Sequence, residues 1–122
     1  MTSEKKTREQ VMREVAASCA AFIEEKKAQS TLVLDLREVN SYLDYFIITT
    51  GSSMVHCRAL ARDIRRYMAA MGYKQRNRPE TESGWIVMDF DEIVIHIFTE
   101  QLREYYQLER LWADAKKIPF AE

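Results

Sequence analysis

The residues best suited to chemistry stand between a predicted strand and the helix that follows it. There the sequence reads Thr50-Gly51-Ser52-Ser53, directly after an apolar run. Backbone N–H groups at the start of a helix, together with the helix dipole, favour a bound anion. This segment therefore has the composition to seat a nucleotide phosphate. The simpler interpretation is a turn glycine followed by a serine N-cap, and both interpretations stay open from these residues alone.

An enzyme that transfers a nucleotidyl group also needs a pair of carboxylates that holds a divalent metal ion near the phosphate. The window after Gly51 in which they are expected falls within the next helix and holds only Asp63. Asp89 and Asp91 have suitable spacing, but they lie in a predicted turn 38 residues after Gly51. A metal-dependent nucleotidyltransferase is therefore the weaker alternative, and we expect no metal and no other cofactor.

Histidine and cysteine indicate no further reactive site. His56 falls in the first turn of a predicted helix and His96 in the middle of a strand. His56 has no Cys, Glu or second His four residues later, and Glu100, four residues after His96, lies beyond the predicted strand, so neither histidine has the partner on a shared face that a metal site needs. Cys19 and Cys57 lie inside predicted helices without metal-ligand spacing. We expect two reduced, inert thiols in a cytoplasmic protein rather than a disulfide.

Arginines give one predicted helix, around Leu60 to Met71, a basic side: Arg58, Arg62, Arg65 and Arg66. A patch that contacts RNA is one interpretation, and a small RNA-binding module is therefore a second alternative function. A solvated helix face is favoured, because Asp63 sits among the arginines and no aromatic residue interleaves with them. The chain as a whole has 18 Lys and Arg against 19 Asp and Glu, a net charge of −1, so no overall field attracts nucleic acid.

A β-hairpin is the element around which the other predicted elements are arranged. The runs Trp85–Met88 and Ile93–Phe98 alternate with the two-residue period of strands and flank a short acidic turn. A two-residue loop at Phe90-Asp91 would pair Met88 with Ile93 and Trp85 with His96. One face then belongs to the core: Ile86, Met88, Ile93, Ile95 and Ile97. The other face is mixed and is either partly covered or a docking surface: Trp85, Val87, Asp89, Glu92, Val94, His96 and Phe98.

The other segments complete a mixed sheet of about five strands that is flanked by helices. An amphipathic helix is predicted from Thr7 to about Lys27, and its Thr7 and Gln10 form a capping box. The remaining predicted elements are strands at Thr31–Leu36 and Asp44–Thr50, a helix that ends at Gly72, at most the start of a strand after Tyr73, and a helical segment from Leu102 to Trp112. Such an alternation of helices and strands predicts an α/β fold.

Length and composition are those of one globular domain. At 122 residues, with 47% hydrophobic and 30% charged residues, the chain is long enough to bury a core without disulfides. We expect a single domain over residues 1–122, with loosely held ends at 1–6 and 113–122. No apolar run is long enough for a membrane helix, and we expect no membrane partner.

Four motifs, in order, resemble the Iojap/RsfS family of ribosomal silencing factors. They are Asp44-Tyr45-Phe46-Ile47-Ile48 leading into Thr50-Gly51-Ser52-Ser53, Trp85-Ile86-Val87-Met88-Asp89, Val94-Ile95-His96-Ile97-Phe98, and Arg103-Glu104-Tyr105-Tyr106-Gln107-Leu108-Glu109-Arg110-Leu111-Trp112. The resemblance covers roughly Leu34 to Trp112. There are two departures from the family pattern. Asp91 stands where many members have a turn glycine, and the loop Arg78-Pro79-Glu80 lacks a glycine often found before the tryptophan strand.

The resemblance implies a nucleotidyltransferase-like α/β fold that has lost its metal carboxylates, and a function that is not enzymatic. Members of the family bind a large-subunit ribosomal protein on the face where the small subunit docks. They thereby block subunit joining and lower translation, notably under nutrient limitation. Organelle relatives act in assembly of the large subunit. A secondary contact with ribosomal RNA and a homodimer away from the ribosome are left open.

The expected interface combines the mixed hairpin face with the segment after it. We expect apolar anchors at Trp85, Phe98 and Tyr106, and carboxylates that meet Lys or Arg of a basic ribosomal protein at Asp89, Glu104 and Glu109. The full predicted set is Trp85, Asp89, His96, Phe98, Arg103, Glu104, Tyr105, Tyr106, Leu108 and Glu109.

Overall fold

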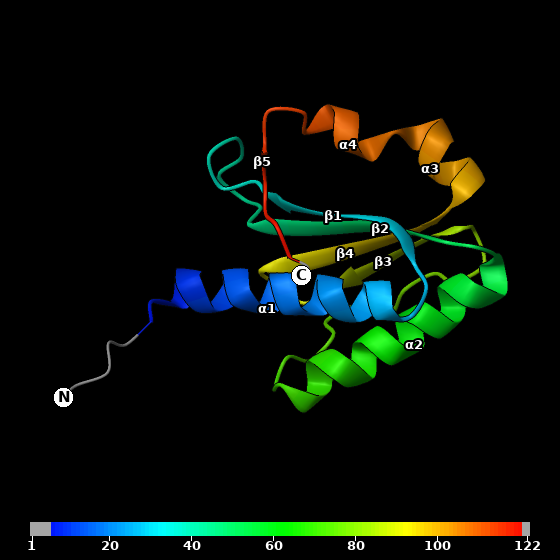
Figure 1. The fold of residues 1–122 in the computed structure, drawn as a ribbon, viewed down its shortest axis with the longest axis horizontal. Helices are drawn as coiled ribbons and strands as arrows, with labels where there is room; N and C mark the ends of the chain where they lie inside the picture. Colours follow the sequence, from blue (N-terminus) through cyan, green and yellow to red (C-terminus); the bar gives the residue numbers. More distant parts are fainter. Residues whose placement is uncertain (1–5, 121–122) are drawn as a thin grey trace.

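The structure, a computed structural model, describes residues 6–120 and contains one five-stranded sheet (Figure 1). Along the chain the elements are α1 (Arg8–Glu25), β1 (Gln29–Asp35), β2 (Tyr45–Gly51), α2 (Met54–Ala70), β3 (Trp85–Asp89), β4 (Ile93–Thr99), α3 (Glu100–Tyr106), α4 (Leu108–Leu111) and β5 (Lys116–Lys117). The strand order is β3-β4-β2-β1-β5. β2 and β4 are parallel, and the other neighbours are antiparallel. The predicted mixed α/β sheet is confirmed. The expected resemblance to nucleotidyltransferases stays a prediction.

Helices cover both faces of the sheet, which divides the interior into two cores. In Figure 1, α1 and α2 lie below the sheet, and α3 and α4 lie above it. The larger core lies between the sheet and the helices α1 and α2. The smaller core, around Phe46, Ile48 and Phe98, lies between the sheet and the helices α3 and α4. All seven residues of β2, the central strand, are buried. This is the pattern expected of a strand with both faces covered.

The N-terminal helix begins with the predicted capping box. The Thr7 hydroxyl accepts the backbone N–H of Gln10 at 3.1 Å, and the Gln10 side chain accepts the N–H of Thr7 at 2.9 Å. Cys19 lies on the buried face of this helix, and burial raises the pKa of its thiol to about 12. The thiol is therefore protonated at neutral pH and a weak nucleophile, which agrees with the expected inert role. Cys19 and Cys57 are both free and buried.

The hairpin has the predicted faces but a different register. Phe90 donates its N–H to the carbonyl of Ile93, so the two loop residues are Asp91 and Glu92, not Phe90 and Asp91. Trp85 therefore pairs with Phe98 rather than with His96, and Met88 with Ile95. The loop begins with a left-handed residue, Asp91 (φ 79°), a conformation that Asp tolerates better than most residues. The partner of each strand residue changes by two positions relative to the predicted register. Because side chains alternate between the two faces with a period of two, this change leaves both faces as predicted.

The fifth strand comes from the C-terminal segment and not from the chain after Tyr73. Lys116 and Lys117 pair with β1, and Ile118, which is buried, donates its N–H to Val33 at 2.8 Å. The expectation that 113–122 is a loose end is therefore wrong for this part. Residues 1–5 of the expected N-terminal loose end, and residues 121–122, lie outside the described range. At the edge of β3, hydrogen bonds come from the side chain of Asn77 and not from a strand. Its amide N–H donates to Val87 O, and its amide oxygen accepts the N–H of Asp89.

A close approach of α2 to the end of β2 explains the glycine at position 51. A Cβ atom at Gly51 would lie 2.6 Å from Cys57 Sγ and 3.2 Å from Cys57 N. Gly51 is therefore the last residue of a strand and not the turn glycine of the simpler interpretation. The predicted serine cap is Ser53, whose side chain accepts the N–H of His56. His56 in turn accepts the N–H of Ser52 at Nδ1 and donates from Nε2 to the carbonyl of Lys26, both at 2.9 Å.

Gly51→Ala tests this close approach. Overpacking a tight site costs about 1–3 kcal/mol, and we expect a loss of that size in the free energy of unfolding measured with urea. In a Cys57→Ala background the sulfur is absent, so the same substitution should cost clearly less. Equal costs in the two backgrounds would show that the sulfur contact does not limit the packing.

Candidate functional site

A left-handed residue divides the predicted C-terminal helix into two short helices. Gln107 has φ 47° and separates α3 from α4, while its N–H still bonds the carbonyl of Arg103. The break changes which side chains face the sheet. Leu108 and Trp112 pack on the smaller core, whereas Tyr105 is exposed. The single helix predicted from Leu102 to Trp112 is therefore wrong in its phase beyond Tyr106.

Aromatic rings connect the edge of the hairpin to α3. The ring of Trp85 stacks on Phe98 at 5.0 Å between centroids and meets Tyr106 at 4.7 Å. Tyr105 contacts Tyr106 edge to face at 4.9 Å. Aromatic pairs in these arrangements add about 0.5–1.5 kcal/mol beyond their buried area. The rings therefore run continuously from a buried end at Phe98 to an exposed end at Tyr105.

His96 is held in one neutral form beneath this layer. Its Nδ1 accepts the indole N–H of Trp85 at 3.1 Å, so the proton of the neutral ring is on Nε2. Nε2 is buried and has no hydrogen-bond partner among the described residues. Burial lowers the pKa of His96 from its ordinary value of 6.5 to about 4. The predicted role of His96 as a contact residue is therefore wrong for this conformation, in which the ring is neutral and interior.

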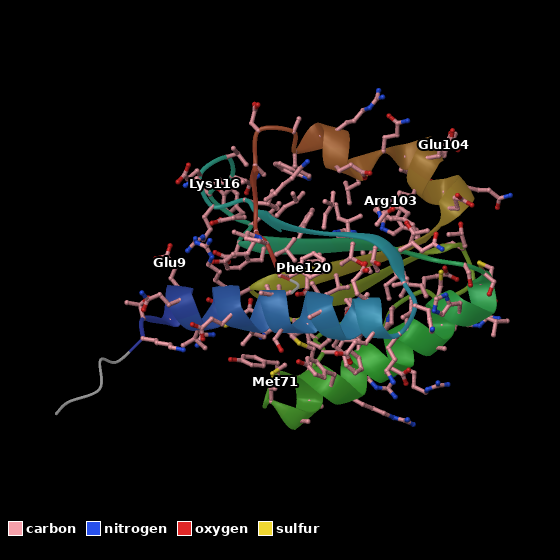
Figure 2. The ribbon with its side chains drawn as sticks, viewed as in Figure 1. Glu9, Met71, Arg103, Glu104, Lys116 and Phe120 are labelled. Atoms are coloured by element: carbon pink, nitrogen blue, oxygen red, sulfur yellow. The ribbon has the colours of Figure 1, made fainter. Side chains whose placement is uncertain are left out.

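Arg103 joins α3 to strands β1 and β2 of the sheet. Its Nη1 donates to the carbonyl of Ser30 at 2.6 Å and to the hydroxyl of Thr50 at 2.9 Å, and its Nε donates to Glu109 at 3.2 Å. Only 11% of its side chain is exposed. Hydrogen bonds from a charged donor contribute about 1.5–3 kcal/mol to stability. Arg103 therefore holds α3 and α4 on the sheet, and its donors are not free to bind a partner. Figure 2 shows Arg103 between α3 and the sheet, and Glu104 on the outer side of α3.

A pocket of about 430 Å³ lies where α3 and α4 meet the ends of β1 and β2. Three carboxylates, Glu100, Glu104 and Glu109, line it together with Arg103 and Arg110. Because Arg103 and Glu109 are bonded to each other, the charged groups available to a neighbouring molecule are Glu100, Glu104 and Arg110. Ser30 and Thr50 were not predicted to belong here, because they lie 73 and 53 residues before Arg103 in the chain and no local pattern connects them.

The outer face of α3 and α4, which we call the helical face, presents apolar and acidic side chains together. Tyr105 is 77% exposed, Leu111 75% and Tyr106 49%. Glu104 is also exposed. Exposed large apolar side chains that gather beside charges are typical of a protein contact surface. Leu111 was not among the site residues predicted from the sequence.

The predicted site residues separate into three groups. Glu104, Tyr105 and Tyr106 lie on the helical face, with Trp85, Leu108 and Glu109 half-buried beside it. Phe98 is fully buried, so its expected role as a surface anchor is wrong; it supports Trp85 from below. Asp89 lies at the other end of the hairpin, where its carboxylate accepts the N–H of Asp91 at 2.7 Å and stabilises the turn.

The titration of His96 gives a test that does not depend on binding. The folded pKa is lower than the unfolded one, so stability is complete above pH 6.5 and is lost as the pH falls toward 4. Between pH 6.5 and pH 5 the loss should be about 2 kcal/mol. His96→Gln keeps an acceptor for Trp85 but does not titrate, so it should lose less stability over this interval in urea unfolding. A variant that follows the wild-type pH dependence would contradict the assignment.

Arg103→Met keeps much of the apolar stem and removes the three donated bonds. We expect amide hydrogen exchange in α3 and α4 to become faster, with a loss of about 1–3 kcal/mol in the free energy of unfolding. The matched control is Arg110→Met, a change at an exposed arginine of α4 that should leave exchange in α3 unchanged. Slow exchange retained in both variants would contradict the anchoring role of Arg103.

The groups needed for metal chemistry are not gathered in the structure. Within residues 6–120 no cluster of three or more His, Cys, Asp or Glu side chains could hold a metal ion. Over the same range no helix has the length and apolar character needed to cross a lipid bilayer.

The fold instead forms an α/β scaffold whose short helices are held with their aromatic and acidic side chains outward. Such a surface is typical of proteins that bind another macromolecule.

Comparison with known proteins identifies the family. The family model described as "Ribosomal silencing factor during starvation" matches residues 9–122, so the chain belongs to this family. Its members are regulatory, ribosome-associated factors and not enzymes. The expected resemblance and the expected lack of an enzymatic function are thus confirmed.

Individual relatives and solved structures agree with this assignment. The ribosomal silencing factor RsfS of Bacillus subtilis is 34% identical over 97 residues, which cover 79% of this chain and 82% of the relative. The chloroplastic protein Iojap of Zea mays is 30% identical over 103 residues, or 84% of this chain and 45% of that protein. A crystal structure of a Chromobacterium violaceum protein superposes with a TM-score of 0.73 at 26% identity, covering 97% of this chain and 94% of the other.

Proposed function

We propose that this silencing factor binds a basic protein of the large ribosomal subunit through its helical face. Bound on the side of the large subunit that meets the small subunit, it would block association of the two subunits by occupying the space and so repress translation. A role in assembly of the large subunit is compatible with the same contact. This mechanism needs neither a nucleotide nor a metal ion, and it places the protein in the cytoplasm with the ribosome.

The single observation that supports this surface is the coexistence of exposed aromatic side chains and unpaired carboxylates on one rigid layer. Tyr105 and Leu111 expose about three-quarters of their surface, which costs free energy unless a partner covers them. Glu104 forms no ion pair with any residue in the described range and points away from the sheet (Figure 2). Aromatic anchors beside carboxylates are complementary to a surface rich in Lys and Arg.

Relatives support the choice of the large subunit. A mouse protein named "Mitochondrial assembly of ribosomal large subunit protein 1" is 30% identical over 101 residues, which cover 75% of this chain and 42% of that protein. The shared segment contains most of the fold described above. The large subunit is therefore the proposed partner of this chain as well, with a contact to its RNA as a secondary feature. A homodimer away from the ribosome stays a prediction.

Steric occlusion has a simple energetic form. A factor bound to one subunit must dissociate before the subunits can join, so it opposes association by RT ln(1 + [factor]/Kd). At a free concentration one hundred times Kd, this amounts to about 2.7 kcal/mol, or a roughly hundredfold decrease in apparent association constant. The degree of silencing then depends on the concentration of the factor, without a catalytic step.

Charge reversal at Glu104 is the direct test of the helical face. Glu104→Lys should weaken cosedimentation with purified large subunits at least tenfold and lower inhibition of subunit joining in parallel, because it places like charges together. Glu25→Lys is the matched control: it reverses an exposed carboxylate on α1, away from the helical face, and should bind as the wild type does. Both variants should unfold at wild-type urea concentrations. Equal binding by Glu104→Lys and the wild type would remove this face from the proposal.

A nucleotidyltransferase, the enzymatic alternative weighed from the sequence, would have a distinct signature. Such an enzyme would show magnesium-dependent binding of a nucleotide, and therefore a rise in Tm when both are added. We expect no change in Tm with ATP and MgCl2, because Gly51 and Ser53 serve to pack and cap α2. A reproducible rise that needs both additions would contradict the docking function as the only activity.

A further inference from the structure

Charge is distributed unevenly over the protein. Helix α2 contains four arginines and one aspartate, a net charge of +3, in a chain whose net charge is −1. The part of the chain outside α2 is therefore acidic. The net charge of the chain alone gave no reason to expect a polyanionic partner, but this uneven distribution leaves α2 with a net positive charge.

The four arginines form a row on the outer side of α2. At 100° per residue, Arg58, Arg62, Arg65 and Arg66 fall within an arc of about 100°. The residues that α2 buries, such as Leu60, Ile64 and Met68, lie on the opposite side. From the first to the last arginine the row is about 12 Å long.

Few of these arginines are neutralised within the protein. Arg65 and Arg66 are exposed and form no ion pair with another residue in the described range. Arg62 meets only its neighbour Asp63, at 3.4 Å, and Arg58 meets Glu82 at 3.6 Å, with three-quarters of the Glu82 side chain exposed. Exposed pairs of this kind contribute little free energy, so most of the positive charge is available to a partner.

The row and the helical face lie on opposite sides of the sheet. In Figure 1, α2 lies below the sheet and α3 and α4 lie above it. One partner surface therefore cannot lie flat against both. A single bound factor would instead stand between two surfaces of different chemistry, one basic and one acidic.

We propose that the arginine row of α2 is a second contact site, which binds the phosphate backbone of ribosomal RNA. The inference rests on the proposed binding to the large subunit and assigns the secondary RNA contact to named residues. Arginine binds phosphate oxygens in a bidentate manner, and an unneutralised row matches a charged backbone without reading its sequence. On a ribosome the abundant negative surface is RNA phosphate, which favours RNA over an acidic protein as the occupant.

Salt dependence measures this contact. Arg65→Gln/Arg66→Gln removes two charges that no described ion pair uses, so folding should be unaffected. The control, Arg13→Gln/Lys74→Gln, removes the same net charge at two exposed positions outside the row. Binding of each double variant to purified large subunits is measured at several KCl concentrations from about 50 to about 300 mM, a range that includes physiological salt. We expect the row variant to reduce the slope of log K against log salt by about 1.4 to 1.8, and the control to leave it unchanged.

A photo-crosslinker identifies the partner. Placed at Ala69, an exposed position on the same side of α2, it should join the factor to ribosomal RNA. A crosslink to a ribosomal protein, a wild-type slope in the row variant, or an equal change in the control would each overturn the inference. Failure of the proposed function has a different signature: Glu104→Lys would bind as the wild type does, while the row variant would still show the reduced slope of log K against log salt.

Discussion

The structure depends on how two short helices are fixed to the second face of the sheet. The left-handed residue Gln107 breaks one helix into two, and the break lets Leu108 and Trp112 face the sheet. Arg103 then joins α3 to Ser30 and Thr50. Once the inner side is occupied in this way, the tyrosines of α3 have no place in the core. The exposed aromatic surface is therefore a consequence of the anchoring, and not an accident of the end of the chain.

A layer whose side chains are held in place suits the proposed mechanism of steric occlusion. Side chains that are already ordered lose less entropy when a partner binds, so more of the contact energy appears as affinity. The hydrogen-bonded pair of Trp85 and His96 serves this purpose, since the indole N–H fixes the neutral histidine and the stacked Phe98 fixes the indole. In the proposed complex, the residues beneath the surface would contribute to binding by holding the exposed ones, without contact to the partner.

Regular periodicity made most of the fold predictable. The capped first helix, the buried central strand and the two faces of the hairpin follow from apolar spacing, which is a local property. The hairpin register was wrong, because the choice between two loops depends on the left-handed tolerance of Asp91 and not on the pattern of the strands. β5 was missed because two exposed lysines carry no strand signal, and the pairing of β1 with the segment ending at the buried Ile118 is decided by tertiary contact. Among the candidate site residues, Glu104 and Tyr105 are exposed, as expected of contact residues, and their role in binding stays a prediction. The burial of Phe98 depends on where α3 and α4 pack, which no local pattern shows.

The central claim is that the helical face meets the large subunit. Hydrogen–deuterium exchange of the factor, alone and with purified large subunits, tests it without altering a residue. We expect slower exchange on binding for residues 104–111, with little change in the middle of α1. Unchanged exchange over 104–111 in a fully bound sample would contradict it.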